Sequence, residues 1–133
     1  MQRARDLLED ADDFLGSAND LLRTGRWSKV CFHSQQCAEL ALKAALNVHG
    51  IEARGHSLTD LLNELQTFER TSYLRDHCRI LDQFYIPTRY ANAFHSGSAS
   101  RHYTEAQARE ALQFATEILK KMREIVEGVA KQG

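Results

Sequence analysis

Arg89 and His95, which five residues separate, are the residues of this chain whose types and spacing most directly suggest chemistry. A guanidinium stays charged at any cellular pH and can present two N–H donors to phosphate oxygens. An imidazole exchanges protons near neutral pH, as the cleavage of RNA by its own 2′-hydroxyl requires. The pair therefore indicates a site that could hold and cleave a phosphodiester.

The only proline, Pro87, lies just before this pair. Residues before a proline avoid helical torsions, so the preceding helix should end near Tyr85, and a short helix can run from about Pro87 to His95. On an ideal helix Arg89 and His95 would lie about 120° apart. They would converge only if the helix unwound at Phe94 and His95, or if two copies met across a symmetric dimer. Alternatively, the proline marks a structural kink in which Arg89 pairs with a carboxylate.

Two other histidines carry weaker signals. His33 and Cys37 share one helix face at a spacing that can grip a transition metal. Two ligands do not make a site, and the chain has no paired Glu-x-x-His motif of the kind that builds a di-iron bundle. The sequence therefore predicts no metal site. His56 directly precedes an expected helix, where its imidazole should bond loop carbonyls.

The stretch SQQCAELALKAAL gives an expected helix a polar edge. Glu39 and Lys43 stand in the favourable order for an i,i+4 ion pair, and we interpret the edge as solvated. The alanines of this helix would let a neighbouring helix approach closely, including one from a second subunit. The edge consists of Gln35, Gln36, Glu39 and Lys43.

The composition is that of an ordinary globular protein, with 43% apolar and 26% charged residues. The net charge of −1 gives no general attraction to nucleic acid or to anionic lipid, so nucleic-acid binding would need a local basic patch. Residues 70–103 could provide one, because they hold five arginines and three histidines against two aspartates.

The three cysteines include no Cys-x-x-Cys pair. Cys31 and Cys37 fall inside an apolar helical pattern, where a reduced cysteine acts as a small hydrophobic residue, as expected in a reducing cytoplasm. The first residues, MQRARDLLED, lack an apolar signal-like core, and no run approaches membrane-spanning length. We therefore expect a soluble cytoplasmic protein.

Apolar residues recur at helical spacing along nearly the whole chain. Gly25 and Gly50 are expected to end the first two helices, which should pack as an antiparallel hairpin. Thr104 and Gln107 form a capping box for the last helix, whereas residues 95–102 should form a loop. These patterns predict a single all-α domain, residues 1–133, folded as a bundle of four main helices plus short pieces. The expected helices cover residues 4–22, 27–46, 57–68, 74–85 and 104–126.

Three stretches of the chain, taken in order, carry a recognisable pattern: WSKVCFHSQQCAELALKAAL, GHSLTDLL and ILDQFYIPTRYANA. Together they make the sequence resemble the HEPN family of small helical proteins, and the similarity covers nearly the whole chain. The resemblance implies an up-and-down bundle of four or five helices, usually a homodimer. It also implies a partner, because many such proteins are encoded beside a minimal nucleotidyltransferase and act with it as a toxin–antitoxin pair.

Active HEPN proteins are metal-independent ribonucleases that use an arginine, four to six residues, and then a histidine. Arg89 and His95 match this motif. The resemblance implies that His95 helps to move the proton, that Arg89 holds the phosphate, and that no cofactor is needed. Active members commonly place a polar residue straight after the arginine, where this chain has Tyr90. The expected nucleotide- or RNA-binding residues are Arg89, Tyr90, Asn92, Arg101 and His102.

Two other functions remain open alongside the ribonuclease or toxin-like RNA-binding subunit. One is a non-catalytic module that binds a nucleotide or a partner and serves a nucleotidyltransferase. The other is a dimeric scaffold without chemistry.

Overall fold

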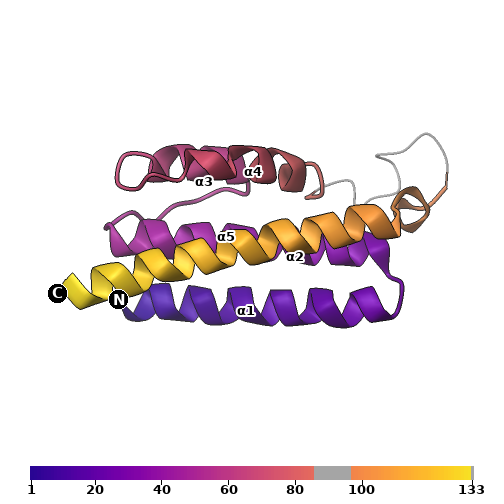
Figure 1. Cartoon of the computed structure of the whole chain (residues 1–133), viewed down its shortest axis with the longest axis horizontal. Helices are drawn as coiled ribbons and strands as arrows, with labels where there is room; N and C mark the ends of the chain where they lie inside the picture. Colours follow the sequence, from indigo (N-terminus) through magenta and orange to yellow (C-terminus); the bar gives the residue numbers. More distant parts are fainter. Residues whose placement is uncertain (86–96, 133) are drawn as a thin grey trace.

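The computed structural model describes residues 1–85 and 97–132 of the chain. These residues form five α-helices and two 3₁₀ helices, with no strand among them (Figure 1). The predicted all-α bundle is confirmed. The helices are α1 (Gln2–Arg23), α2 (Trp27–Val48), α3 (Leu58–Leu65), η1 (Ser72–Leu74), α4 (Arg75–Asp82), η3 (Ala99–His102) and α5 (Glu105–Gln132).

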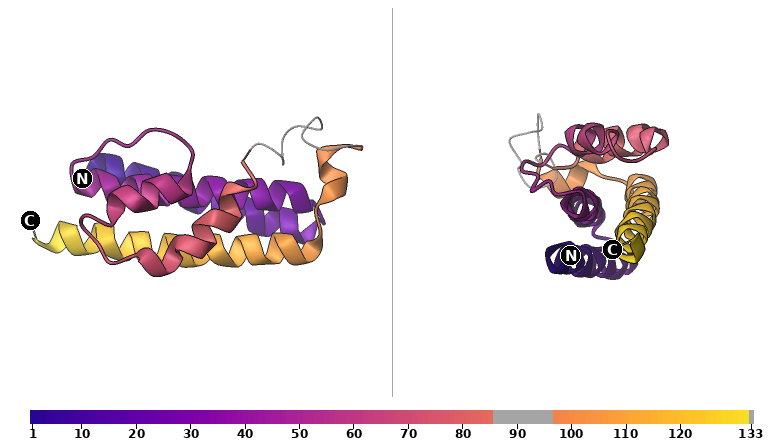
Figure 2. Two further views of the ribbon diagram at one scale, coloured as in Figure 1. Left: turned by 90° about the horizontal axis from the view of Figure 1, so that it is seen from above. Right: turned by 90° about the vertical axis from the view of Figure 1, so that its left-hand side faces the viewer.

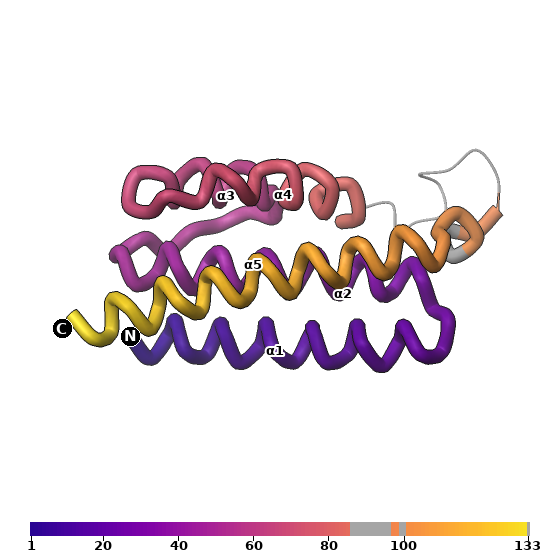
Figure 3. Tube along the Cα trace, in the orientation of Figure 1, coloured from indigo at the N-terminus to yellow at the C-terminus, as the bar shows by residue number. Residues whose placement is uncertain are grey.

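Two layers make up the bundle. The long helices α1, α2 and α5 run side by side, and the short helices α3 and α4 cover α2 and α5 on the side away from α1 (Figures 1 and 2). Both termini lie at one end of the bundle, whereas the α1–α2 turn and η3 lie at the other (Figure 3). The residues that precede and follow the predicted catalytic segment are thus positioned by different layers.

The link between α1 and α2 is a tight turn that contains Gly25. Its φ of +74° is in the left-handed region that glycine adopts without strain. The Gly25 amide donates to the Leu22 carbonyl at 3.3 Å and the Arg26 amide donates to the Leu21 carbonyl at 3.1 Å, so these two carbonyls near the end of α1 are satisfied. The predicted antiparallel hairpin is confirmed, with 22 residues in each helix.

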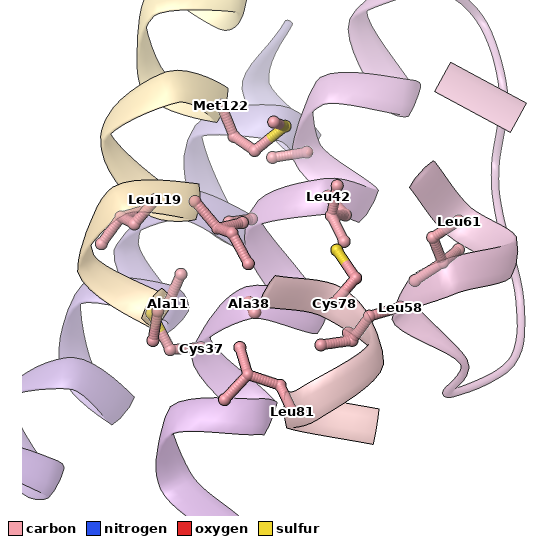
Figure 4. Close-up of a cluster of buried hydrophobic side chains, with 14 of the residues drawn as sticks. Ala11, Cys37, Ala38, Leu42, Leu58, Leu61, Cys78, Leu81, Leu119 and Met122 are labelled. Carbon is pink, nitrogen blue, oxygen red and sulfur yellow. The ribbon is translucent and has the colours of Figure 1, made fainter. Parts of the chain in front are cut away.

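Small residues let the three long helices approach closely. Ala38 and Ala41 of α2 are fully buried, as are Ala11 of α1 and Ala115 of α5. Figure 4 shows Ala11 and Ala38 within the core, among larger side chains such as Leu42 and Met122. The expectation that alanine-rich faces would receive a second subunit is wrong for these faces, because packing within the subunit already covers them.

All three cysteines are reduced and buried in this core. Burial raises the pKa of the Cys31, Cys37 and Cys78 thiols to about 12, so they remain protonated at neutral pH. Their predicted role as small hydrophobic residues is confirmed for Cys31 and Cys37.

Several boundaries differ from the expectation, among them the end of α5, which runs to Gln132 rather than to residue 126. Helix α3 ends at Leu65, so Phe68 lies beyond it, 42% exposed and stacked on the His49 ring at a centroid distance of 4.5 Å. Helix α4 ends at Asp82, three residues before Tyr85. Residues 99–102, expected in a loop, form η3, which a left-handed Gly97 precedes.

The start of α3 is held by a carboxylate from α4. Ser57 Oγ accepts the Asp60 amide at 3.2 Å, as an N-cap should. Asp82 accepts the Leu58 amide at 2.6 Å and, through its other oxygen, the Thr59 amide at 3.1 Å. The Thr59 hydroxyl donates to the same carboxylate at 2.7 Å. These bonds fix the residues that lead into α3 against the end of α4.

The predicted capping box of α5 is confirmed. The Gln107 amide donates to Thr104 Oγ1 at 3.2 Å, and the Thr104 amide donates to Gln107 Oε1 at 2.9 Å. Within residues 1–85 and 97–132, no helix combines the length and the apolar character that a bilayer span requires.

Candidate functional site

The candidate site predicted around Arg89 and His95 is described through its two flanks, because the described residues stop at Tyr85 and resume at Gly97. The short helix predicted for residues 87–95 lies outside them. So do four predicted site residues: Arg89, Tyr90, Asn92 and His95.

On the C-terminal flank, Arg101 and His102 are both exposed on η3. A Cβ atom placed on Gly97 would lie 3.4 Å from Arg101 Cδ and 3.6 Å from His102 Nε2, so the two side chains lie close to the Gly97 backbone. The cationic side chain of Arg101 and the imidazole of His102 therefore stand together, directly after the predicted catalytic segment.

The two flanks are joined by an aromatic contact. Tyr103, which follows η3, packs edge-to-face on Phe84 at a centroid distance of 5.9 Å. Partial burial raises the pKa of the Tyr103 hydroxyl, with a smaller contribution from Cys31. The contact brings the residue that follows η3 against the residue that precedes Tyr85.

On the N-terminal flank, the Tyr85 ring stacks on His56, with centroids 4.4 Å apart and ring planes 16° from parallel. His56 Nδ1 lies 3.0 Å from Glu39 Oε1. The His56 side chain is 54% exposed, whereas the Glu39 side chain is only 6% exposed. An exposed imidazole thus rests on a buried carboxylate.

Glu39 has several donors around it. Lys43 Nζ donates to Oε2 at 3.0 Å, and Gln35 Nε2 donates to Oε1 at 3.3 Å. Gln35 Nε2 also lies 3.2 Å from the His56 carbonyl, and Gln36 Nε2 donates to Gln35 Oε1 at 2.7 Å. A buried carboxylate is stable only with partners of this kind.

This cluster corrects the view of the α2 edge as solvated. Gln35 is fully buried and Glu39 is 4% exposed, although the predicted Glu39–Lys43 pair does form. The spacing already carried this signal. Residues three and seven positions apart lie on the same face of a helix, and both positions after Gln35 (Ala38 and Leu42) and both after Glu39 (Leu42 and Leu46) are buried. His56 also differs from the expectation, since its ring bonds a carboxylate rather than loop carbonyls.

His33 and Cys37, whose spacing could in principle grip a metal ion, lie in apolar surroundings. The His33 ring meets Phe14 edge-on at 5.5 Å, and Cys37 is buried. Burial lowers the pKa of His33, and the nearby Lys29 lowers it further. In residues 1–85 and 97–132, no group of three or more His, Cys, Asp or Glu is arranged to hold a metal ion.

The predicted basic stretch is divided by the fold. Arg75 and Arg79 are exposed on α4, and Arg101 is exposed on η3. His77 instead faces α5, where its ring stacks on Phe114 at 4.0 Å. It also bonds Glu117, beside a groove of 380 Å³ between α4 and α5 that holds charges of both signs. Among the described residues of this run, the exposed arginines Arg75, Arg79 and Arg101 thus lie on two different elements, and His77 packs against α5.

A model of the HEPN domain family matches residues 4–125. The chain belongs to the HEPN family. This HEPN protein therefore has the fold and the family that its sequence motifs predicted.

Two solved structures show the same fold. Protein TT1696 from Thermus thermophilus is 43% identical, covers 94% of this chain and 99% of its own length, and superposes with a TM-score of 0.90. ST0689, described as an archaeal HEPN homologue, is 33% identical, with coverage of 95% and 99% and a TM-score of 0.80.

A more distant relative carries a functional name. "Putative toxin MJ1304" from Methanocaldococcus jannaschii is 25% identical over 133 residues, which include 92% of this chain and 88% of that protein.

Proposed function

We propose that this HEPN protein is a toxin-like endoribonuclease that cleaves single-stranded RNA without a metal ion or another cofactor. One observation carries the proposal. The segment with the family spacing of Arg89 and His95 is bordered on one side by the exposed Arg101 and His102. On the other side it is bordered by an imidazole that a buried carboxylate holds. The described flanks of this segment thus hold groups that can bind phosphate and groups that can exchange protons.

The reaction is a transfer of the phosphoryl group within the RNA. The 2′-hydroxyl loses its proton and its oxygen forms a bond to phosphorus. The bond between phosphorus and the 5′-oxygen breaks, and that oxygen takes up a proton. Arg89 holds the non-bridging oxygens as negative charge builds on them, and His95 transfers a proton. The products are a 2′,3′-cyclic phosphate and a 5′-hydroxyl.

RNA recognition is local, because the net charge of −1 provides no general attraction. Arg101 and His102 contact phosphates beside the cleaved bond, and Tyr90 offers a face on which a base can stack. Asn92 supplies hydrogen bonds to the nucleotide. Unpaired RNA is the preferred substrate because its bases are free to stack.

The proposed assembly is a homodimer in which two copies of the Arg89–His95 segment share one cleft. The partner is an antitoxin-like nucleotidyltransferase that restrains the activity. The likeness to "Putative toxin MJ1304" supports the toxin-like role.

The proposal is tested by incubating the purified protein with single-stranded RNA in the presence of a chelator. We expect fragments that end in cyclic phosphate, and we expect His95→Ala and Arg89→Ala each to reduce the cleavage rate by about 100-fold or more. RNA binding without cleavage would instead favour the non-catalytic module. Equal cleavage by the wild type and His95→Ala would remove His95 from the reaction.

A further inference from the structure

A trough runs along the side of α5 that faces α4 and the connection from α3 to α4. It joins the groove of 380 Å³ between α4 and α5 to a smaller hollow of 170 Å³, because Lys121 and Glu124 line both. The stripe of α5 residues along its floor is about 22 Å long, which suits a helix of another chain. The stripe consists of Glu117, Lys121, Glu124, Gly128 and Gln132, which helical spacing sets on one face.

Two aromatic side chains stand exposed on the opposite wall of the trough. Tyr73, which lines the groove, is 65% exposed. Phe68, which stacks on His49 in the wall of the hollow, is 42% exposed. Together with Met1, they are the large hydrophobic residues that the described part of the chain leaves exposed. Exposed aromatic residues gathered beside one trough are typical of a surface that contacts another protein.

The floor of the trough contains a glycine that packing within the subunit does not explain. Gly128 lies inside α5 and is exposed, and a Cβ atom built on it would stand in open space. Glycine destabilises the interior of a helix relative to alanine. At this position the missing side chain leaves room for a second chain to approach α5 closely.

The charges of the floor complement those of a second α5 that runs in the opposite direction. Neither Lys121 nor Glu124 makes an ion pair among the described residues. A two-fold axis that passes between residues 122 and 123 would set Lys121 opposite the partner subunit's Glu124, and the reverse pair would form by symmetry. The same axis sets Gly128 opposite the partner subunit's Glu117, so a long side chain meets the open position.

We propose that the trough is a docking surface for a second copy of this chain, which packs its own α5 antiparallel to the first. Phe68 and Tyr73 of each subunit then cover part of the other subunit's α5, and two ion pairs fix the register. The trough extends towards the end of the bundle at which both termini lie (Figure 3). The inference goes beyond the proposed function, because no residue of the trough belongs to the predicted catalytic segment. Combined with the cleft proposed for that segment, this contact would build an assembly larger than a dimer.

Charge reversal tests the register of the contact. Lys121→Glu sets two acids against each other in both pairs, and Glu124→Lys sets two bases against each other. We expect each variant to raise the dissociation constant of the contact by about 10-fold or more. The double variant Lys121→Glu/Glu124→Lys restores both pairs. An equimolar mixture of the two single variants should also associate, because each pair then joins an acid to a base. Analytical ultracentrifugation over a range of concentrations measures the masses.

Two matched controls separate the trough from the rest of the surface. Glu127→Lys changes an exposed acid of the same helix that lines a groove on the α1 side, so we expect wild-type association. Gly128→Gln should weaken association, because the added side chain fills the space that the partner needs. Gly16→Gln makes the same change at an exposed glycine of α1 that also faces open space, and we expect no effect. Circular dichroism checks that each variant is folded.

The outcomes are independent of the RNA-cleavage test. Recovery of the wild-type mass in the mixture supports the contact, since each single variant then finds its complement only in the other. Equal masses for the wild type and both single variants at every concentration overturn it. Weakened association that the mixture does not restore overturns the antiparallel register. A wild type that associates as expected but leaves RNA intact overturns the proposed function alone.

Discussion

Two histidines in this protein have similar partners but opposite exposure. His56 bonds Glu39 and His77 bonds Glu117, and each ring also stacks on an aromatic side chain. The His56 side chain is 54% exposed and its carboxylate 6%. The His77 side chain is 24% exposed and its carboxylate 47%. In one cluster the anchor is buried and the imidazole faces outward, whereas in the other the order is reversed.

The two rings also bond through different nitrogens. His56 uses Nδ1, whereas His77 uses Nε2, the nitrogen farther from its own backbone. A ring on a buried, well-partnered carboxylate can act on a ligand, because its anchor keeps its position when the ring changes charge. A ring bonded to an exposed carboxylate mainly links two helices, here α4 and α5. The same residue types therefore have different uses, which burial decides.

Removing the carboxylates should give the largest difference between the two clusters. Glu39→Ala removes the buried carboxylate that Lys43 and Gln35 both bond. We therefore expect the free energy of unfolding to fall by about 3 kcal/mol. Glu117→Ala breaks a pair with an exposed member, and we expect a loss below about 1 kcal/mol. Urea unfolding of both variants beside the wild type measures the two losses. Similar losses would show that burial does not separate the clusters.

The sequence predicted most of the fold because helical spacing is a local property. The apolar stripes gave α1, α2 and α5, and local motifs gave the Gly25 turn and the Thr104–Gln107 cap. The contact of Asp82 with α3 was not predictable in this way, because Asp82 lies 23 positions after Thr59 along the chain. Only the packing of α4 against α3 brings them together.

The residues of the candidate site also differ in whether local sequence could reveal them. Arg89 and His95 were chosen from a motif, and Arg101 and His102 from local charge. Glu39 was assigned to a solvated helix edge and His56 to a structural role, although they form one cluster with Tyr85. Their partnership depends on how the loop before α3 folds over α2, which no single stretch of sequence encodes. Treating Gln35 and Glu39 as members of the buried α2 face would have pointed to a polar cluster in the core.

Asp82 should affect the His56 cluster and leave the His77 cluster intact. Asp82→Ala removes three hydrogen bonds from the first turn of α3, and we expect a loss of stability of about 1–2 kcal/mol. Native-state hydrogen exchange should become faster at the amides of Leu58 and Thr59. Asp60→Ala, on the exposed side of the same turn, serves as the control. Faster exchange in α5 near Glu117 of the Asp82 variant would show that the two clusters are not independent.

The Nδ1 atoms of His33 and His56 differ in their hydrogen bonding. His56 Nδ1 bonds Glu39, whereas His33 Nδ1 is buried and has no hydrogen-bond partner among the described residues. Burial lowers the pKa of His33 below its ordinary value of 6.5, with Lys29 as a second cause and Asp13 opposing them. The unfolded chain therefore binds a proton more readily than the folded one.

The effect of pH follows from this difference. Well above pH 6.5 the ring is neutral in both states, so the folded protein has its full stability. As the pH falls from 6.5 towards the folded pKa, the unfolded state gains protons and the free energy of unfolding decreases. His33→Phe keeps a ring against Phe14 but cannot titrate, so its stability should fall less than that of the wild type between about pH 7.5 and pH 5.5. Urea unfolding across this range measures both slopes, and equal slopes would mean that His33 is as easily protonated in the folded protein as in the unfolded chain. We expect this to be the smallest of the three effects, because the variant removes one titration and no hydrogen bond among the described residues.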